Sequence, residues 1–407
     1  MMKDLSELEP LRLVEEGRAR VYVPRLEAYK DSYGHMDPAR APVFYNPRMI
    51  SNRDLAVCGA ETYAKLYKRR DMRLAEPFCS TGVRGIRYAL EVSQVEHVLM
   101  GDISEKAVKL ANINVLLNRV QEKVKVIRSE AKRLLISHIE IEGRFDLIDV
   151  DPFGSPASFI LNAIEALREG GLLAVTATDL PPLFGVHPPA CRRKYSSVPL
   201  RVSYSPEIGT RILIGYIARE AAKMEKGIEV LLAYHMDHYI RAYVIVERGA
   251  RKADQALGNI GYVLHCQKCG WRDMVKGFLP RVRTPYCPLC HGELMLAGPL
   301  WIGSLARDDF SKEVLHELRE REYLLERRRL IRMMEKIRAE MRIGKPFYYT
   351  TSEVARLVRR NEVKVVKLIE VLKDNGYEAT VTHFDPKGVK TNADLKAVMR
   401  AYIELTA

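Results

Sequence analysis

The sequence predicts an α/β fold built on a parallel sheet that has helices on both of its faces. Between residues 73 and 179, strand-like and helix-like segments alternate at short intervals, as βαβ units require. The strand-like segments are continuous apolar runs rather than alternations of apolar and polar residues, so each strand is expected to be buried on both faces. A loop that contains glycine follows the first of these strands, which is typical of doubly wound folds.

The elements of this sheet are expected in a regular order along the chain. Residues 21–25 and 41–47 carry strand signals, and 49–70 has a helical pattern. The parallel strands are expected at 73–78, 97–102, 123–129, 145–151 and 172–179, with helices at 85–93, 104–118 and 158–171. Ser104 is a good N-cap for the second of these helices, and glycine is expected to end the third. A helix at 207–227 and two strands within 228–249, joined by a turn near Asp237, complete this half.

The pattern changes near residue 250, where we expect a domain boundary. Residues 1–250 are predicted to form the α/β domain, and residues 251–407 a C-terminal α+β domain. Residues 308–342 have a helical pattern. Two short helices are expected in 350–377, with Thr351 or Ser352 as the cap and Gly376 as the stop, before a strand and turn at 379–388. This order is typical of a winged-helix-like module.

The chain carries a large positive charge. Its 407 residues contain 65 Lys and Arg against 52 Asp and Glu, which gives a net charge of +13. An excess of this kind is often solvated surface, but it also fits a polyanionic partner. No apolar run is long enough for a membrane span, and the N-terminus has no secretory signal. Because four of the seven cysteines form CxxC pairs, we expect a reducing, cytoplasmic location.

The glycine-containing loop and a later acid indicate a nucleoside cofactor. The loop spans 76–87 and includes Gly82, and Asp102 follows twenty residues later at the end of a strand. An acid at this place can bind the two hydroxyls of a ribose. Taken alone, the loop fits a tight turn equally well. The pair of features does not separate a dinucleotide from S-adenosylmethionine.

The tetrapeptide Asp151-Pro152-Phe153-Gly154 indicates methylation of an amine on a base. A carboxylate and a backbone carbonyl that accept the hydrogens of an exocyclic amine balance its developing positive charge. Asp151 and the carbonyl of Pro152 supply these acceptors, and Phe153 can stack on the base. Asp149 competes with Asp151 for the carboxylate role, because both face the same side of a strand. We favour Asp151 because it lies at the carboxyl end.

Four cysteines have the spacing of a zinc ribbon, which we place at 262–297. Two CxxC pairs are separated by seventeen residues, and four thiolates make a closed, structural zinc site; the ligands are Cys266, Cys269, Cys287 and Cys290. His265 and His291 are adjacent and are expected to be exposed rather than ligands. Cys58, Cys79 and Cys191 are expected to be buried small residues rather than nucleophiles.

Basic residues lie near the junction of the two halves. The segment 191–201 contains four cations and a tyrosine; the cations are Arg192, Arg193, Lys194 and Arg201. Further cations precede or lie within the cysteine region, namely Arg248, Arg251, Lys252, Lys268, Arg272, Lys276, Arg281 and Arg283. Each alone fits solvated surface. Together they favour a track for the phosphates of a nucleic acid.

The chain resembles the tRNA guanine-N2 dimethyltransferases, which act on position 26 of tRNA. The resemblance rests on VFYNPRMISNRDL, STGVRGIR, DVDPFGSP, CRRKYSSVPLR, both CxxC pairs, GPLWIG and THFDPKG. It implies a class I (Rossmann-like) methyltransferase that uses S-adenosylmethionine, with a C-terminal tRNA-binding domain. It implies tRNA as the partner, and no membrane or obligate protein partner is inferred.

The resemblance also implies roles for single residues. Arg53 and Arg84 look like cofactor contacts, Asp102 like the ribose ligand, and Glu130 or Ala131 like neighbours of the adenine. Asp151 looks like the catalytic carboxylate, and Phe44 and Phe153 look like aromatics on either side of the guanine. Two alternatives stay open: an adenine or other amino-methyltransferase, and a non-catalytic RNA-binding protein with a vestigial nucleotide fold.

Overall fold

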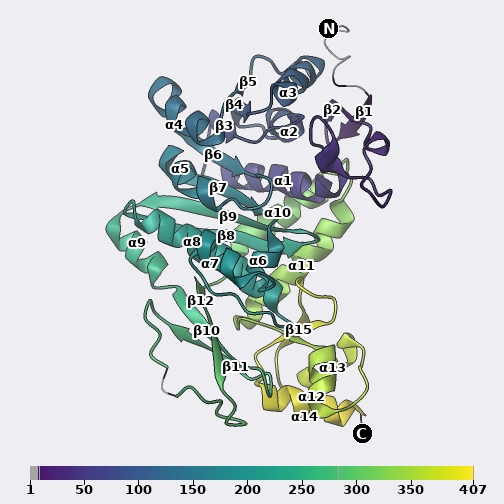
Figure 1. Cartoon of the computed structure of the whole chain (residues 1–407), viewed down its shortest axis with the longest axis vertical. Coiled ribbons are helices and arrows are strands. Elements are labelled where there is room, and N and C mark those ends of the chain that lie inside the picture. The colour runs from purple at the N-terminus through teal and green to yellow at the C-terminus, as the bar shows by residue number, and fades with distance from the viewer. Residues whose placement is uncertain (1–7, 9, 283, 407) are drawn as a thin grey trace. The chain divides into compact units, whose positions relative to one another are not determined.

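A computed structural model describes residue 8, residues 10–282 and residues 284–406. The chain forms two compact units (Figure 1). The first contains residues 1–152, 159–175 and 312–331, and the second contains residues 153–158, 176–311 and 332–407. The expected functional boundary at residue 250 stays a prediction, because these units describe compactness alone.

The first unit holds the parallel strands of the main sheet. The seven-stranded sheet has the order β5-β4-β3-β6-β7-β9-β8, and its first five strands pair in parallel. These five are β3 (Met72–Glu76), β4 (Val95–Asp102), β5 (Val124–Arg128), β6 (Phe145–Val150) and β7 (Leu167–Ala177). The predicted α/β fold class is therefore confirmed in its coarse form. Strand order reverses between β3 and β6, so the crevice at their carboxyl ends is the place where such sheets bind ligands.

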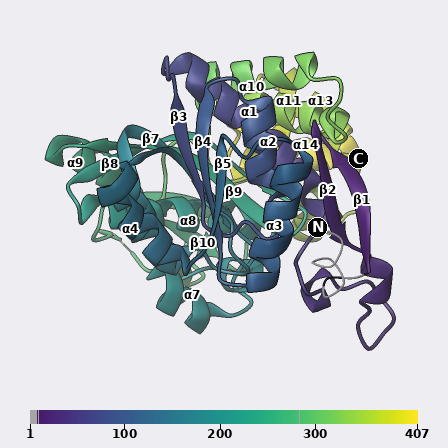
Figure 2. The ribbon, with the colours of Figure 1, turned by 90° about the horizontal axis from the view of Figure 1, so that it is seen from above.

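Helices cover both faces of these strands. They are α1 (Ile50–Leu66), α2 (Val83–Glu91), α3 (Glu105–Leu117), α4 (Ala131–Glu142) and α5 (Ile160–Ala166). Figure 2 shows α4 on one side of β3, β4 and β5, and α2 and α3 on the other. Ser104 caps α3 as expected, since its side chain accepts a hydrogen bond from the Ala107 amide. An antiparallel hairpin, β1 (Leu11–Glu16) and β2 (Ala19–Pro24), precedes the sheet.

Several expected elements have other bounds in the structure. Residues 41–47 form bends and the start of a 3-10 turn rather than a strand, because Asn46 caps that turn and Pro47 begins it. The helix expected to end at glycine stops at Ala166, and Gly170 and Gly171 lie within β7. Sequence analysis missed α4 altogether.

The second unit contains a hairpin, the cysteine region and a C-terminal module. The hairpin strands are β8 (Lys226–Met236) and β9 (Tyr239–Arg248), with Asp237 in the left-handed region at the expected turn. The helices in this part of the chain are α6 (Leu180–Leu183), α7 (Pro188–Tyr195), α8 (Ser205–Ala222) and α9 (Ala250–Leu257). Three antiparallel strands form the cysteine region, in the order β11 (Arg272–Lys276), β10 (Ile260–Cys266) and β12 (Leu294–Trp301).

The C-terminal module has its own apolar core. It consists of β13 (Tyr349–Thr350), α12 (Thr351–Val358), α13 (Val365–Asp374), β14 (Ala379–Val381), β15 (Gly388–Thr391) and α14 (Leu395–Thr406). The cap of α12 is Thr350 rather than Thr351 or Ser352, because the Thr350 side chain accepts from the Glu353 amide. The helical stretch expected at 308–342 is two helices, α10 (Asp308–Glu320) and α11 (Arg327–Ile343). Among the described residues, none of the helices is both long enough and apolar enough to cross a membrane.

Candidate active site and metal centre

The loop after β3 approaches the sheet closely at two glycines. Gly82 has a φ of +77°, a conformation that favours glycine, and it is the N-cap of α2. A Cβ at Gly85 would lie 2.8 Å from Oε2 of Glu76, so a larger residue would collide with that carboxyl group. The Gly85 amide instead donates a hydrogen bond of 2.9 Å to Glu76. Glycine at position 85 therefore lets the first turn of α2 pack against the end of β3, and glycine at position 82 lets the loop pack against Met100 of β4 and Ala111.

Asp102 is positioned at the carboxyl end of β4. Its two carboxylate oxygens accept hydrogen bonds from the backbone amides of Ser80 (3.0 Å) and Ser104 (2.9 Å). These bonds fix the carboxylate between the glycine-containing loop and the start of α3. Each oxygen keeps further capacity to accept a hydrogen bond, as binding of two ribose hydroxyls requires.

A cluster of carboxylates surrounds Arg84 at the start of α2. Its guanidinium contacts Asp151, Asp149 (3.3 Å) and Glu76 (3.6 Å), and it donates to the Asn52 side chain at 2.8 Å. Asp149 is fully buried, whereas the Asp151 side chain is 16% exposed. Asp149 and Asp151 are the two alternatives for the carboxylate role, and of these Asp151 is the one that is accessible from solvent. The resemblance implies that Arg84 contacts the cofactor; its described contacts are with these carboxylates.

Burial changes the protonation of Glu76. Burial raises the pKa of Glu76 to about 8; Arg84 opposes this rise, and the nearby charges of Asp149 and Asp151 add to it. Burial and the two neighbouring aspartates therefore favour the protonated form of Glu76.

Sequence reasoning missed Glu76, Tyr88 and Asn52. Tyr88, on α2, donates a hydrogen bond of 2.6 Å from its hydroxyl to Asp149. An acid at the end of the strand before the glycine-containing loop was the available signal for Glu76. Tyr88 and Asn52 join the cluster only through tertiary packing, so no local pattern marks them.

Arg53 takes part in a different buried network. It forms a two-pronged ion pair with Glu16, at 2.6 and 2.7 Å, and its side chain is only 7% exposed. Tyr45 and Arg87 also donate to Glu16 (3.0 and 3.1 Å). Burial alone would raise the pKa of Glu16, but the two arginines lower it to about 2. The described contacts of Arg53 are structural, and its implied role at the cofactor stays a prediction.

The remaining predicted residues of the first unit lie near the loops of the site. Phe44 is half-buried, and its carbonyl accepts a hydrogen bond from the Ser80 hydroxyl. Glu130 is exposed and caps α4 by accepting from the Arg133 amide at 3.0 Å, while Ala131 is buried. Both adenine-side roles stay predictions.

Pro152 ends the first part of the first unit, and the segment 153–158 that follows it belongs to the second unit, where hydrogen bonds hold it. Pro152 is buried, whereas Phe153 is 70% exposed. The Gly154 amide donates to the Thr178 hydroxyl at 2.8 Å, and Ser155 donates to the hydroxyl of Tyr195. These bonds present the Phe153 ring on a fixed backbone.

Tyr195 connects this segment to the basic helix α7. Its buried hydroxyl donates to Asp179 at 2.6 Å, and Lys194 forms an ion pair with the same carboxylate at 3.0 Å. Arg192 and Arg193 are exposed, as is Arg201. Arg201 also lines a cavity of about 640 Å³ together with Arg356 of α12. All four predicted tRNA-binding cations are therefore exposed, and Lys194 also pairs with Asp179.

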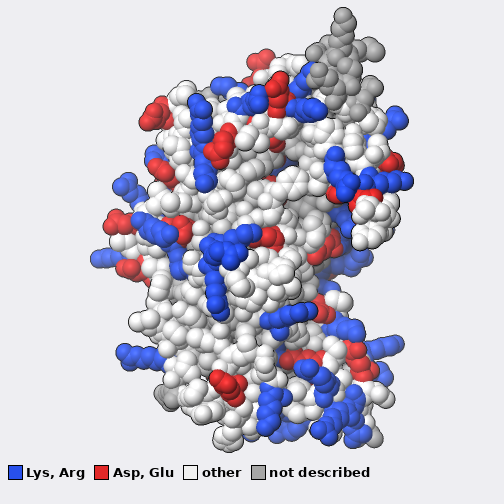
Figure 3. Space-filling view, in the orientation of Figure 1, with Lys and Arg blue, Asp and Glu red and all other residues white. Residues whose placement is uncertain are grey.

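The C-terminal module adds a second basic surface. Residues 356–367 contain five exposed cations and one acid, and that acid, Glu362, pairs with Lys387 at 2.9 Å. On the face shown in Figure 3, Lys and Arg side chains gather over α12, α13 and α14. Sequence analysis did not single out this surface.

The four cysteines come together as predicted. All four Sγ atoms lie within 4.8 Å of one another. The distance between Cys266 and Cys290 is 3.4 Å, and that between Cys269 and Cys287 is 3.6 Å. Tetrahedral zinc with Zn–S bonds of about 2.3 Å separates its sulfurs by roughly 3.8 Å, so the cluster fits this metal.

Both CxxC turns have the same backbone arrangement. The Gly270 amide donates to the Cys266 carbonyl, and the His291 amide donates to the Cys287 carbonyl. Gly270 and His291 both have positive φ. His291 is exposed as expected. The expected exposure of His265 is wrong: it is buried and bonds to the Tyr204 hydroxyl at 3.0 Å, because it lies within β10. Cys58, Cys79 and Cys191 are buried as expected.

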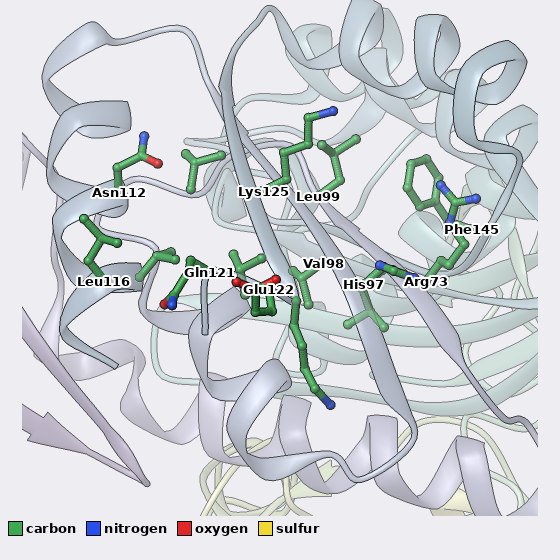
Figure 4. Close-up of a pocket in the computed structure, with 15 residues that line it drawn as sticks. Arg73, His97, Val98, Leu99, Asn112, Leu116, Gln121, Glu122, Lys125 and Phe145 are labelled. Atoms are coloured by element: carbon green, nitrogen blue, oxygen red, sulfur yellow. The ribbon is translucent and has the colours of Figure 1, made fainter. Parts of the chain in front are cut away.

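A cavity of about 780 Å³ in the first unit does not involve the candidate site residues (Figure 4). It is lined by residues such as Arg73, His97, Asn112 and Phe145. Arg73 and Phe145 lie at the amino ends of β3 and β6. Because parallel sheets bind ligands at the carboxyl ends of their strands, the cluster around Asp151 is the better candidate for the active site.

Comparisons with known proteins place the chain in a family. The family "N2,N2-dimethylguanosine tRNA methyltransferase" matches residues 17–403. The chain belongs to this family. It is 39% identical over 391 residues to a tRNA (guanine(26)-N(2))-dimethyltransferase from Pyrococcus horikoshii, covering 93% of this chain and 95% of the relative. A protein of the same description from Methanobrevibacter smithii is 36% identical over 389 residues, covering 95% and 96%.

A solved structure of the family has the same fold over nearly the whole chain. The structure of Trm1 from Pyrococcus horikoshii with S-adenosyl-L-methionine aligns with a TM-score of 0.82 and 36% identity. The alignment covers 96% of this chain and 99% of that one. The dimethyltransferase fold thus extends through both units of the chain.

Proposed function

We propose that this family member transfers methyl groups from S-adenosylmethionine to the exocyclic N2 amine of guanine at position 26 of tRNA. The products are N2-methylguanosine and N2,N2-dimethylguanosine. The observation that carries the proposal is the accessible carboxylate of Asp151, held by Arg84 at the carboxyl end of the sheet in a chain of this family. The relatives' names and the cofactor in the solved structure support the substrate and the methyl donor.

The residues present fit S-adenosylmethionine. Gly82 and Gly85 allow the close packing of the loop after β3, whose Ser80 amide binds Asp102, and Asp102 offers two fixed acceptors for the ribose hydroxyls. When bound, this cofactor supplies a methyl group made electrophilic by a sulfonium sulfur.

Asp151 has the central role in the proposed chemistry. The amine lone pair of guanine is delocalised into the ring and becomes nucleophilic when its hydrogens are held by acceptors. Asp151 and the carbonyl of Pro152 accept these hydrogens, and Asp151 takes the proton that the nitrogen loses after it gains the methyl group. Because Asp149 is buried against Tyr88, it stabilises positive charge from within the cluster rather than touching the base.

Aromatic side chains would hold the base. A base must leave its stack to reach such a pocket, which costs a few kcal/mol. Stacking on an aromatic ring offsets about 1–3 kcal/mol per base. Phe153, which is exposed on a fixed backbone, suits this role, and we assign Phe44 to the opposite face of the guanine.

The tRNA-binding role goes to the exposed cations of the second unit. Arg192, Arg193, Lys194 and Arg201 are assigned to phosphates, together with the basic surface at 356–367. We assign residues 1–250 to catalysis and residues 251–407 to tRNA binding. Zinc in the four-cysteine site would be structural, since the four thiolates leave no open position. The cytoplasmic location expected from the sequence stays a prediction.

Nucleoside analysis tests the proposal. The purified chain is incubated with an unmodified tRNA transcript and labelled S-adenosylmethionine, and the methylated nucleosides are identified and mapped by mass spectrometry. We expect N2-methylguanosine and then N2,N2-dimethylguanosine at position 26. Methylated adenosine would establish the rival amino-methyltransferase, and binding of tRNA without binding of S-adenosylmethionine would establish a non-catalytic RNA-binding protein.

A further inference from the structure

Exposed apolar side chains are concentrated in the cysteine region. Of the 19 large hydrophobic residues that are exposed among the described residues, six lie within 278–296. They are Phe278, Leu279, Val282, Tyr286, Met295 and Leu296. Four of the six belong to the loop at 277–286, between β11 and Cys287. We call this segment the ribbon loop; within it, residue 283 is not described. A solvated loop of a folded protein rarely keeps this many large apolar side chains, so the concentration indicates a binding surface.

The backbone of the ribbon loop is fixed at both ends. At its start, the Gly277 amide donates to the Ile260 carbonyl at 2.9 Å, and the Tyr262 hydroxyl donates to the Phe278 carbonyl at 3.0 Å. At its end, Tyr286 forms a β-bridge with Glu293. Phe278 is 52% exposed and Leu279 is 87% exposed on this anchored frame. Their exposure is therefore built into the fold of the cysteine region.

The charge of this surface indicates which class of molecule it binds. Residues 274–292 contain three cations, and the acids that flank them are Asp273 and Glu293, both exposed. Lys276 and Arg281 are exposed beside the apolar side chains. Aromatic rings interleaved with cations suit a single-stranded nucleic acid, because bases stack on the rings while phosphates pair with the cations. The exposed cations within the loop favour this partner over an apolar protein surface.

We propose that the ribbon loop binds unpaired nucleotides of the tRNA, with Phe278 and Tyr286 stacking on bases and Lys276 and Arg281 binding the adjoining phosphates. The inference rests on the proposed function for the identity of the RNA. It goes beyond that function by assigning a base-contacting surface separate from the residues of the methylation site.

Single substitutions in the ribbon loop test the proposal through tRNA affinity. Binding of a fluorescent unmodified tRNA transcript is measured by anisotropy at several salt concentrations. Phe278→Ala and Tyr286→Ala should each weaken binding by about fivefold to a hundredfold, the effect of losing one stacked base. Matched controls are Tyr33→Ala and Ile141→Ala, at side chains that are 84% and 75% exposed in the first unit, and these should leave the affinity unchanged.

Salt dependence separates the two kinds of contact. Lys276→Ala and Arg281→Ala should each reduce the slope of log K against log salt by about one, whereas Phe278→Ala should lower the affinity without changing that slope. Phe278→Trp should restore binding, because the larger ring also stacks. Zinc content and S-adenosylmethionine affinity, measured on each variant, report whether the cysteine region and the first unit remain folded.

Unchanged tRNA affinity in Phe278→Ala, Leu279→Ala and Tyr286→Ala would overturn the proposal. Self-association of the wild-type chain in sedimentation that these variants abolish, with tRNA affinity retained, would assign the surface to a protein interface instead. Methylation at saturating tRNA tests the proposed function separately. The ribbon-loop variants should then keep the wild-type rate, and a wild-type chain that binds tRNA without methylating guanine would fail only the proposed function.

Discussion

Two clusters of charged residues in the first unit contain the same residue types but have different roles. Around Glu16, Arg53 and Arg87 contribute two guanidinium groups to a network whose side chains are 7% exposed or less. Around Arg84, a single guanidinium meets Asp149, Asp151 and Glu76. The arginines lower the pKa of Glu16 to about 2, whereas burial raises the pKa of Glu76 to about 8.

The difference between the clusters lies in their access to solvent. The network around Glu16 is closed, because Arg87 pairs with Asp54 and Glu91 as well as with Glu16, and all of these side chains are fully buried. This network joins the hairpin at Glu16 to helices α1 and α2. The cluster around Arg84 reaches solvent at Asp151, whose side chain is 16% exposed. We therefore infer that the open cluster serves catalysis and the closed network serves stability.

The substitution Asp151→Asn tests the catalytic role of the cluster around Arg84 and has the largest expected effect. The amide keeps a carbonyl acceptor but loses the charge that balances the developing cation. Single-turnover methyl transfer should slow by about 10²- to 10⁴-fold. Calorimetry should show binding of S-adenosylmethionine retained, as the control for folding. A variant with the full transfer rate would remove Asp151 from its role.

The substitution Glu16→Gln tests the stabilising role of the network around Glu16. Loss of this charge leaves Arg53 buried without this carboxylate partner, whereas Arg87 keeps Asp54 and Glu91, and the free energy of unfolding in urea should fall by about 3–5 kcal/mol. The transfer rate per folded molecule should stay near that of the wild type. The opposite outcome, normal stability with loss of S-adenosylmethionine binding, would support the cofactor role that the family resemblance implies for Arg53.

The substitution Glu76→Gln tests the comparison through the pH dependence of the free energy of unfolding. Because the pKa of Glu76 is raised in the folded state, the unfolded chain loses this proton first, and stability falls as pH rises from about 4.5 to about 8. The loss is about 1.4 kcal/mol for each unit of pKa difference. Urea unfolding at a series of pH values should show a flatter profile for Glu76→Gln in this window.

Glu16 gives the opposite pH dependence. Its pKa is lowered in the folded state, so its contribution is present above about pH 4.5 and is lost as the pH falls towards 2. A Glu76→Gln profile parallel to that of the wild type between pH 4.5 and 8 would show that Glu76 ionises normally in the folded chain.

A matched pair of tyrosines gives the smallest effect. Tyr45 donates to Glu16 and Tyr88 donates to Asp149, each through its hydroxyl. Tyr45→Phe and Tyr88→Phe should each reduce the free energy of unfolding by about 1.5–3 kcal/mol, as a hydrogen bond to a charged group does. Only Tyr88→Phe should also slow single-turnover transfer, by severalfold. Equal effects on transfer would mean that both clusters serve the reaction alike.

Sequence reasoning recovered the parts of the molecule that local patterns encode. The alternation of strands and helices, the Ser104 cap and the gathering of four cysteines follow from short-range periodicity and spacing. Asp102 and Asp151 could be found because strand ends are where such sheets bind ligands.

The rest depends on partners that are distant in the sequence. Glu16 meets Arg53 37 residues later, and Tyr88 meets Asp149 61 residues later. No residue close to Arg53 in the sequence indicates that its guanidinium pairs with Glu16 of the β1–β2 hairpin. Likewise, Gly170 and Gly171 were expected to end a helix, but β7 begins at Leu167 and pairs with β6 across the sheet. In these cases tertiary packing overrides the local signal.

The acceptor atom is the most direct test of the account. Single-turnover transfer is measured on two tRNA transcripts that differ only at position 26, one with guanosine and one with inosine, which lacks the exocyclic N2 amine. The account predicts that both transcripts bind with similar affinity and that only the guanosine transcript is methylated. Methylation of the inosine transcript at a comparable rate would contradict transfer to the N2 amine and the role of Asp151 beside it.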